Sequence, residues 1–96
     1  MGVNLTEDPT FYDRADSHIH LANEYCAKVG RGKVSASLMY SSARFQAWNA
    51  ATWANNVEEM KTNRQETVKY FVGQYQAMLE DNLDDYIDHF AKYMAA

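Results

Sequence analysis

The segment GRGKVSAS, residues 30–37, places two glycines, an arginine and a lysine directly ahead of a predicted helix start. Backbone N–H groups at a helix start bind anions, so this segment raises the question of a phosphate-binding loop. A Walker-type loop requires a glycine, four further residues and then Gly-Lys-Ser/Thr. Here Ala27 stands in place of the first glycine and Val34 in place of the metal-binding hydroxyl. The sequence therefore favours a turn between two helices, in which Gly30 ends the first helix and Gly32 turns the chain.

Three cations stay candidates for binding a small anion: Arg31, Lys33 and Arg44. Arg44 is the only charged residue between positions 34 and 56. A buried guanidinium without a partner is very costly. We therefore expect Arg44 to pair with an acid of the first helix or with Asp84 or Asp85. An ion pair that fixes the fold explains Arg44 more simply than a ligand site does, because many buried charge networks are structural.

The histidines do not predict a metal site. His18 and His20 point about 160° apart, because they stand two positions apart on a predicted helix. His18 falls on the apolar face, where we expect a core histidine with a hydrogen-bonded nitrogen. His20 stands four residues before Glu24, and His89 stands four residues after Asp85; solvated polar pairs account for both. A carboxylate-bridged di-iron bundle needs Glu-x-x-His, which this sequence lacks, so we predict neither a metal nor a cofactor.

No set of residues at catalytic spacing stands out. Cys26, the single cysteine, falls on the predicted buried face, where a thiol is usually inert. No nucleophile is placed at a recognisable spacing from a base, so we predict no catalytic residue and favour a non-enzymatic protein. Nucleic-acid binding is disfavoured, because four cations spread over residues 28–44 of a chain with a net charge of −4 make a sparse footprint.

Helices are the elements that must position these residues. The chain has one proline and four glycines and is rich in residues that favour helices. In the first segment, residues 7–30, Asp8 or Thr6 can cap a helix, Pro9 suits its first position and Gly30 suits its end. The apolar face of this helix would carry Phe11, Ala15, His18, Ile19, Ala22, Cys26 and Val29.

The second segment, residues 34–56, is apolar or small around nearly its whole circumference, and Ser35 or Gly32 can cap it. Such a helix is expected to be buried on all sides, and two flanking helices in 96 residues do not easily enclose it. We therefore predict that a second copy of the chain, or an unidentified protein partner, completes its cover. Aromatic residues dominate such interfaces. The predicted interface residues are Tyr40, Phe45, Trp48 and Trp53.

The third segment begins at TNRQE, residues 62–66, where Thr62 or Asn63 can open a capping box. Apolar residues then recur at helical spacing, in phase, as far as Met94. Residues with capping side chains at Asp81–Asn82 leave open a break that would make a fourth helix. The unbroken phase favours one long or kinked helix.

Charge is unevenly distributed along the chain. No acid occurs between Tyr25 and Val57, whereas residues 80–88 contain five acids and no base. This asymmetry suits either nucleic acid at the basic stretch 28–44 or a contact of that stretch with the acidic stretch 80–88. The sequence leaves open whether this contact forms within one chain or between chains.

Three stretches, FYDRADSHIHLAN, GKVSASLMYSSARFQAW and TVKYFVGQYQAMLEDNLDDYI, together resemble a family of short proteobacterial proteins classed as a domain of unknown function. The resemblance extends from Phe11 to Ile87. It implies a small, helical, bacterial cytoplasmic protein, and it implies no activity, cofactor or catalytic residue.

These observations predict an all-α domain over residues 1–96, with residues 1–7 flexible, built from three long helices and forming a homodimer. No leader or membrane-spanning segment is apparent, so we expect a cytoplasmic location. The leading hypothesis is a non-enzymatic helical interaction or regulatory module that self-associates. The alternative is a small-ligand or anion-binding protein, enzymes included, that uses Arg31, Lys33 and Arg44. A thermal-shift screen with phosphates, nucleotides and carboxylates separates the two, because a ligand at 100 times its Kd stabilises a fold by about 2.7 kcal/mol.

Overall fold

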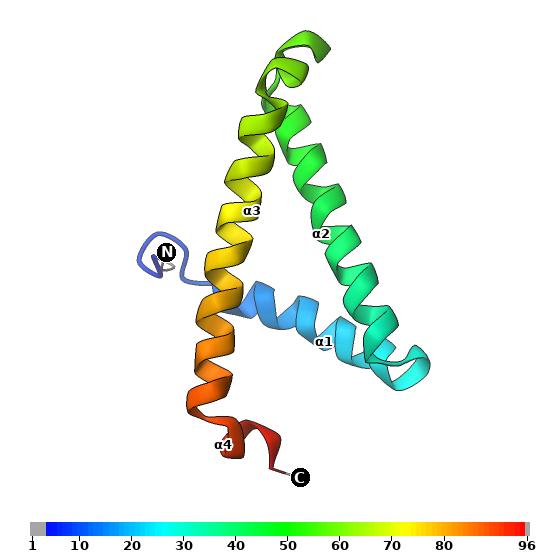
Figure 1. Cartoon of the computed structure of the whole chain (residues 1–96), viewed down its shortest axis with the longest axis vertical. Helices are drawn as coiled ribbons and strands as arrows, with labels where there is room; N and C mark the ends of the chain where they lie inside the picture. The colour runs from blue at the N-terminus through cyan, green and yellow to red at the C-terminus, as the bar shows by residue number, and fades with distance from the viewer. Residues whose placement is uncertain (1–3, 96) are drawn as a thin grey trace. The chain divides into compact units, whose positions relative to one another are not determined.

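Three long helices and a short one make up the protein (Figure 1). The structure is a computed structural model that describes residues 4–95, and these contain no strand. Helix α1 spans Phe11–Val29, α2 spans Arg31–Trp53, α3 spans Val57–Asp88 and α4 spans Phe90–Met94. The prediction of an all-α protein with three long helices is confirmed.

The chain divides into two compact units, the first ending at Trp53 and the second beginning at Ala54. The expectation of one domain over residues 1–96 stays a prediction. Of the seven residues expected to be flexible, residues 1–3 lie outside the described part of the chain. Asn4 begins a hydrogen-bonded turn, in which its Oδ1 accepts from the Thr6 backbone N–H at 3.0 Å. The Asn4 carbonyl also accepts from the Asp8 backbone N–H at 2.9 Å.

Helix α1 begins later than the capping residues predicted. Its first residue is Phe11, and neither Asp8 nor Thr6 caps it; Thr10 precedes it without a capping side-chain hydrogen bond. The carboxylate of Asp8 instead accepts from the Arg14 guanidinium at 2.6 Å, and the Thr10 hydroxyl accepts from the same group at 2.7 Å. The Arg14 guanidinium, which has several donors, thus binds the side-chain oxygens of Asp8 and Thr10 that could otherwise cap the helix.

The predicted inner face of α1 is confirmed in part. Four of its members are half-buried, namely Phe11, Ala15, Ala22 and Cys26. His18 and Ile19 are exposed, so the expectation of a core histidine at position 18 is wrong.

A single residue joins α1 to α2. Gly30 adopts φ 91° and ψ 154°, and its N–H donates to the Cys26 carbonyl at 3.0 Å, so it ends α1 as predicted. Helix α2 begins at the next residue, and Gly32 lies in its first turn. The expectation that Gly32 turns the chain is therefore wrong, and so is a helix cap at Gly32 or Ser35. The Val34 N–H donates to the Gly30 carbonyl at 3.3 Å, so the same glycine serves both helices.

Helix α3 begins five residues before the predicted capping box. Asn56 is extended, with φ −159° and ψ 172°, and its side chain accepts from the Glu59 N–H at 2.9 Å. Asn55 reinforces this start by donating to the Glu59 carboxylate at 3.0 Å. The predicted cap at Thr62 or Asn63 is wrong: the Thr62 hydroxyl donates to the Glu58 carbonyl from within the helix.

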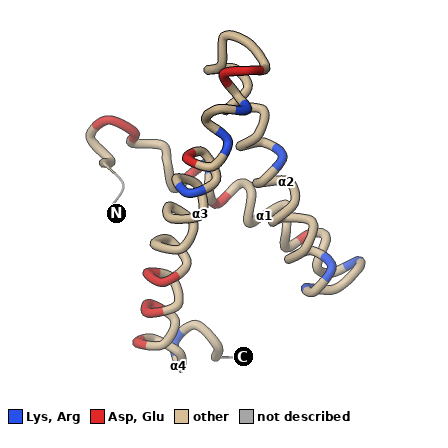
Figure 2. Tube along the Cα trace, turned by 45° about the horizontal axis from the view of Figure 1, so that its top comes forward, with Lys and Arg blue, Asp and Glu red and all other residues tan. Residues whose placement is uncertain are grey.

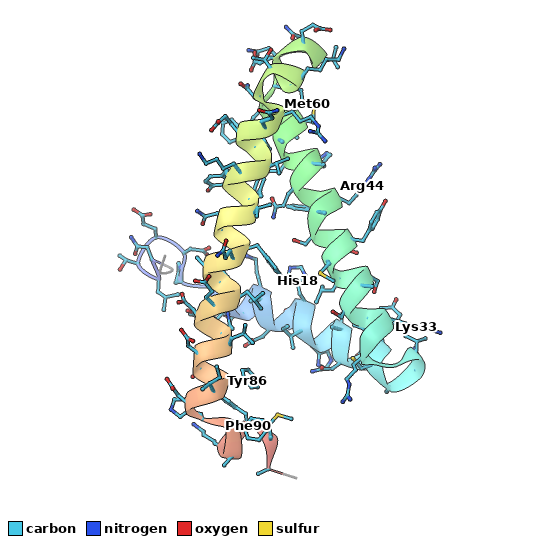
Figure 3. All side chains as sticks on the ribbon, in the orientation of Figure 1. His18, Lys33, Arg44, Met60, Tyr86 and Phe90 are labelled. Carbon is cyan, nitrogen blue, oxygen red and sulfur yellow. The ribbon has the colours of Figure 1, made fainter. Side chains whose placement is uncertain are left out.

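The long third helix is confirmed. Helix α3 continues through Asp81–Asn82, where the Asn82 side chain donates to the Met78 carbonyl at 2.7 Å rather than capping a new helix. The break comes at His89, which has φ −127° and ψ 30° and separates α3 from α4. Tyr86 and Phe90, labelled in Figure 3, lie on either side of this break.

Within residues 4–95, the only buried side chain is Val34, which is 6% exposed. It stands in the first turns of α2, close to the Gly30 turn, where α1 and α2 contact each other. The long apolar stripe of α3 is exposed or half-buried along its length. Apolar burial is the main force that stabilises folds, and within the described residues these helices bury little apolar surface.

Candidate interaction surface

The aromatic surface of α2 is defined by Tyr40, Phe45, Trp48 and Trp53, the four residues predicted for an interface. Their exposed fractions are 67%, 59%, 60% and 81%. Phe45 and Trp48 project from the same side of α2, about 60° apart, and their ring centroids lie 5.4 Å apart at an interplanar angle of 46°. These two rings therefore form one continuous apolar contact area.

The other two aromatic residues lie apart from this pair, because Arg44 comes between Trp48 and Tyr40 round the helix, and Asn49 comes between Phe45 and Trp53. Tyr40 lies on one flank of the Phe45–Trp48 pair, and Trp53 lies on the opposite flank near the end of α2. Monomeric proteins rarely expose large contiguous apolar patches, and those that occur usually mark binding sites.

The three cations proposed for an anion site do not converge. Lys33 and Arg44 lie on nearly the same side of α2, but about 16 Å apart along its axis. Arg31 projects about 140° round the helix from Arg44. A single small anion cannot contact all three through this helix. Lys33 and Arg44 instead lie between Tyr40 and Trp48 round the helix.

Arg44 is exposed and projects away from α2 (Figure 3). Among the described residues of its own unit, no acid of α1 forms an ion pair with Arg44, whereas a pair with Asp84 or Asp85 of the other unit stays a prediction. The expectation assumed that α2 would be enclosed, whereas an exposed guanidinium is hydrated and needs no protein partner.

The C-terminal part of α3 carries the acidic stretch (Figure 2). Glu80 accepts a hydrogen bond from Gln76 at 2.9 Å. Asp81, Asp84 and Asp88 form no ion pair or side-chain hydrogen bond within residues 4–95. Figure 2 also shows basic positions along α2, without an intervening acid.

A polar cluster closes the junction of α3 and α4. The Asp85 carboxylate lies 3.1 Å from His89 Nδ1 through Oδ1, and its Oδ2 accepts from the Tyr93 hydroxyl at 2.8 Å. The Tyr86 and Tyr93 rings pack at 4.5 Å. The hydrogen bond to Asp85 raises the pKa of the Tyr93 phenol, because only the protonated hydroxyl can donate it.

Sequence spacing indicated only part of this cluster. The Asp85–His89 pair was apparent from its spacing of four residues, and the structure confirms that the two side chains meet. The sequence analysis did not predict the contact of Tyr93 with Asp85. The spacing of eight residues between them is the one sequence feature that places both on a similar side of a helix. The Tyr93 hydroxyl reaches Asp85 because the helix breaks at His89.

The other polar candidates are ordinary surface features. His20 Nε2 lies 3.2 Å from Glu24 Oε1, and both side chains are largely exposed. Cys26 is a half-buried free thiol. Within the described residues, no three His, Cys, Asp or Glu side chains gather closely enough to hold a metal ion.

A family model described as a protein of unknown function, DUF3144, matches residues 11–87. The chain belongs to the DUF3144 family. This match confirms the resemblance seen in the sequence over the same residues. No curated protein and no solved structure matches the chain.

The DUF3144 match begins with the first residue of α1 and ends one residue before the end of α3. It therefore includes the whole aromatic surface and most of the acidic stretch. His89 and Tyr93 lie outside it. No helix among residues 4–95 is long and apolar enough to cross a membrane.

Proposed function

We propose that this DUF3144 protein is a non-enzymatic helical interaction module that acts in the cytoplasm and self-associates through the aromatic surface of α2. The observation that carries the proposal is the contrast within the first unit: one valine is buried, while four large aromatic side chains of α2 are at least 59% exposed. Burial of such side chains at an interface contributes most of the binding energy in many complexes.

The composition of α2 supports this assignment. The helix carries no acid and only three cations over 23 residues, so its surface is poorly hydrated compared with an ordinary exposed helix. Its small residues allow another helix to approach closely. A second copy supplies the same apolar surface, and paired identical surfaces are the commonest way in which homo-oligomers form.

Removal of the most exposed ring tests the proposal. Trp53 is 81% exposed, so Trp53→Ala removes few contacts from the isolated chain but a large one from an interface. We expect the dissociation constant to rise by roughly tenfold or more, which corresponds to about 1.4 kcal/mol. Sedimentation equilibrium over a range of concentrations gives this constant directly.

The matched control is Tyr70→Ala. Tyr70 is 59% exposed and lies on the side of α3 opposite its apolar stripe, so its removal should leave the dissociation constant unchanged. A wild-type chain that stays monomeric at every concentration would overturn the proposal. So would a Trp53→Ala variant that associates and melts as the wild type does.

A further inference from the structure

We infer that His89 is a hinge at which the end of the chain moves between two states: the folded-back α4 of this structure and a single helix that continues α3 through Met94. A latch holds the folded-back state, and it is defined as the contacts of Tyr93 with Asp85 and with Tyr86. All of these residues belong to the second unit of the chain. The inference therefore does not depend on the self-association proposed for α2.

Only one residue interrupts the helix. The His89 N–H donates to the Asp85 carbonyl at 3.0 Å, and the His89 carbonyl accepts from the Tyr93 N–H at 3.0 Å, so helical hydrogen bonds reach the hinge from both sides. The interruption lies in the backbone angles of His89, φ −127° and ψ 30°, which must change to about −63° and −42° to continue the helix. Residues 74–96 contain no proline and no glycine, so no residue type there prevents this change.

The apolar spacing of α3 continues across the hinge. In one helix, Phe90 and Tyr93 would lie within about 40° of Tyr86 round the axis, on the same apolar stripe. In this structure α4 instead turns away from the axis of α3 (Figure 1), and the Phe90 side chain is 65% exposed. The side chains at the end of the chain are therefore spaced for a helix that the folded-back state does not form.

The charges at the end of α3 also favour a longer helix. A helix C-terminus carries a partial negative charge, which cations stabilise and acids destabilise. The last turn of α3 contains Asp85 and Asp88 and no base, whereas Lys92 lies in the last turn of α4. Continuation to Met94 would move the negative helix end away from the two acids and place it beside Lys92.

The latch opposes this continuation. The Tyr93 hydroxyl donates to Asp85 Oδ2 at 2.8 Å, and the Tyr86 and Tyr93 ring centroids lie 4.5 Å apart. In a continuous helix, Tyr93 would lie about 12 Å from Asp85 and about 10 Å from Tyr86 along the axis. Side chains on a helix lean toward its N-terminus, so Asp85 and Tyr86 would lean away from Tyr93. The latch and the continuous helix therefore exclude each other.

The hinge controls the length of the apolar stripe that α3 presents. In the folded-back state the Tyr93 ring lies against Tyr86, and the stripe ends there. In the continuous state Tyr86, Phe90 and Tyr93 would follow one another along one side of the helix, which lengthens the stripe by about 10 Å. The change is local, because it requires new backbone angles at His89 alone.

Removal of one hydroxyl tests the latch. Tyr93→Phe keeps the ring but cannot donate to Asp85, whereas Asp85 itself is left unchanged because it also contacts His89. We expect the ratio of the continuous to the folded-back state to rise by roughly tenfold, as for the loss of a hydrogen bond to a charged group.

Nuclear magnetic resonance of the labelled full chain measures this ratio. The wild type should show nuclear Overhauser contacts between the ring protons of Tyr86 and Tyr93 and a non-helical Cα shift at His89. In Tyr93→Phe the contacts between the two rings should weaken, and the His89 shift should move into the helical range. The matched control is Tyr86→Phe, because the Tyr86 hydroxyl forms no hydrogen bond within the described residues. Its His89 shift should equal that of the wild type.

Each outcome bears on a separate part of the inference. A wild type with helical shifts through His89 and no contact between the two rings overturns the folded-back state. A Tyr93→Phe variant that keeps the wild-type contact and shift overturns the latch. If residues 89–94 of that variant lose their helical shifts, the continuous state is overturned. A variant that becomes helical across His89, with an unchanged Tyr86→Phe control, establishes the hinge.

Discussion

Gly30 carries the turn between α1 and α2, and its replacement by alanine is predicted to destabilise the fold. Its φ of 91° with ψ of 154° lies in a region that residues with a Cβ rarely adopt. No heavy atom lies within 4 Å of an added Cβ, so the cost of Gly30→Ala comes from the backbone rather than from a collision.

The magnitude follows from that conformation. A residue with a side chain in this region of φ and ψ costs about 1–3 kcal/mol. For a chain of this size each kcal/mol lowers Tm by roughly 4–8 °C. The matched control is Gly32→Ala, two residues further on, where the backbone is helical and an added Cβ again meets nothing within 4 Å. There alanine should stabilise the helix by up to about 0.5–1 kcal/mol, because it restricts the unfolded chain.

Thermal unfolding followed by circular dichroism measures both effects. All variants must be compared at one concentration, because the stability of a self-associating protein depends on concentration. Tm should fall for Gly30→Ala and rise or stay level for Gly32→Ala. A Gly30→Ala variant as stable as the wild type would show that the turn does not need a positive φ, and the α1–α2 junction described above would be wrong.

Two further predictions concern the ends of α3. Asn56→Ala removes the hydrogen bond that the Asn56 side chain accepts from the Glu59 N–H, and it should lower the free energy of unfolding by about 0.5–2 kcal/mol, measured by thermal or denaturant unfolding. The control Asn63→Ala changes an exposed residue within the helix and should be neutral or slightly stabilising. Equal losses of stability in the two variants would contradict the observed helix start. The raised pKa of Tyr93 predicts one phenol that ionises later than the others in an absorbance titration and is missing from Tyr93→Phe. Because the folded pKa is raised, the contribution of Tyr93 to stability is complete below its ordinary pKa of about 10 and is lost as pH rises through the raised value. A Tyr93→Phe variant that loses its absorbance change at about pH 10 rather than above it would rule out the contact with Asp85.

The helices were predictable because their signals are local. The apolar spacing of α1 and the position of Gly30 at its end depend on residues within a few turns. The continuity of α3 through Asp81–Asn82 followed from the unbroken apolar phase, which outweighed the presence of capping side chains. The start of α3 was missed because Asn56 and Asn63 are equally good caps in sequence, and only a formed hydrogen bond distinguishes them.

The errors at the candidate site share a different cause. The expectation for His18 assumed that the apolar face of α1 is buried, and the expectation for Arg44 assumed that α2 is enclosed. Periodicity shows which residues share a face, but it does not show what lies against that face. The contact of Tyr93 with Asp85 was missed for a related reason. It depends on the helix break at His89, which no Pro, Gly or other helix-breaking residue at that position predicts.

The single-residue joint at Gly30 also sets an order of events during synthesis. Helices relax in about 0.1–1 μs, whereas a ribosome adds roughly 5–20 residues per second. Once α2 has emerged, residues 54–96 therefore take seconds to follow, and α1 and α2 have formed their contact long before that. During this interval the contact between α1 and α2 exists in a chain that has not yet made α3.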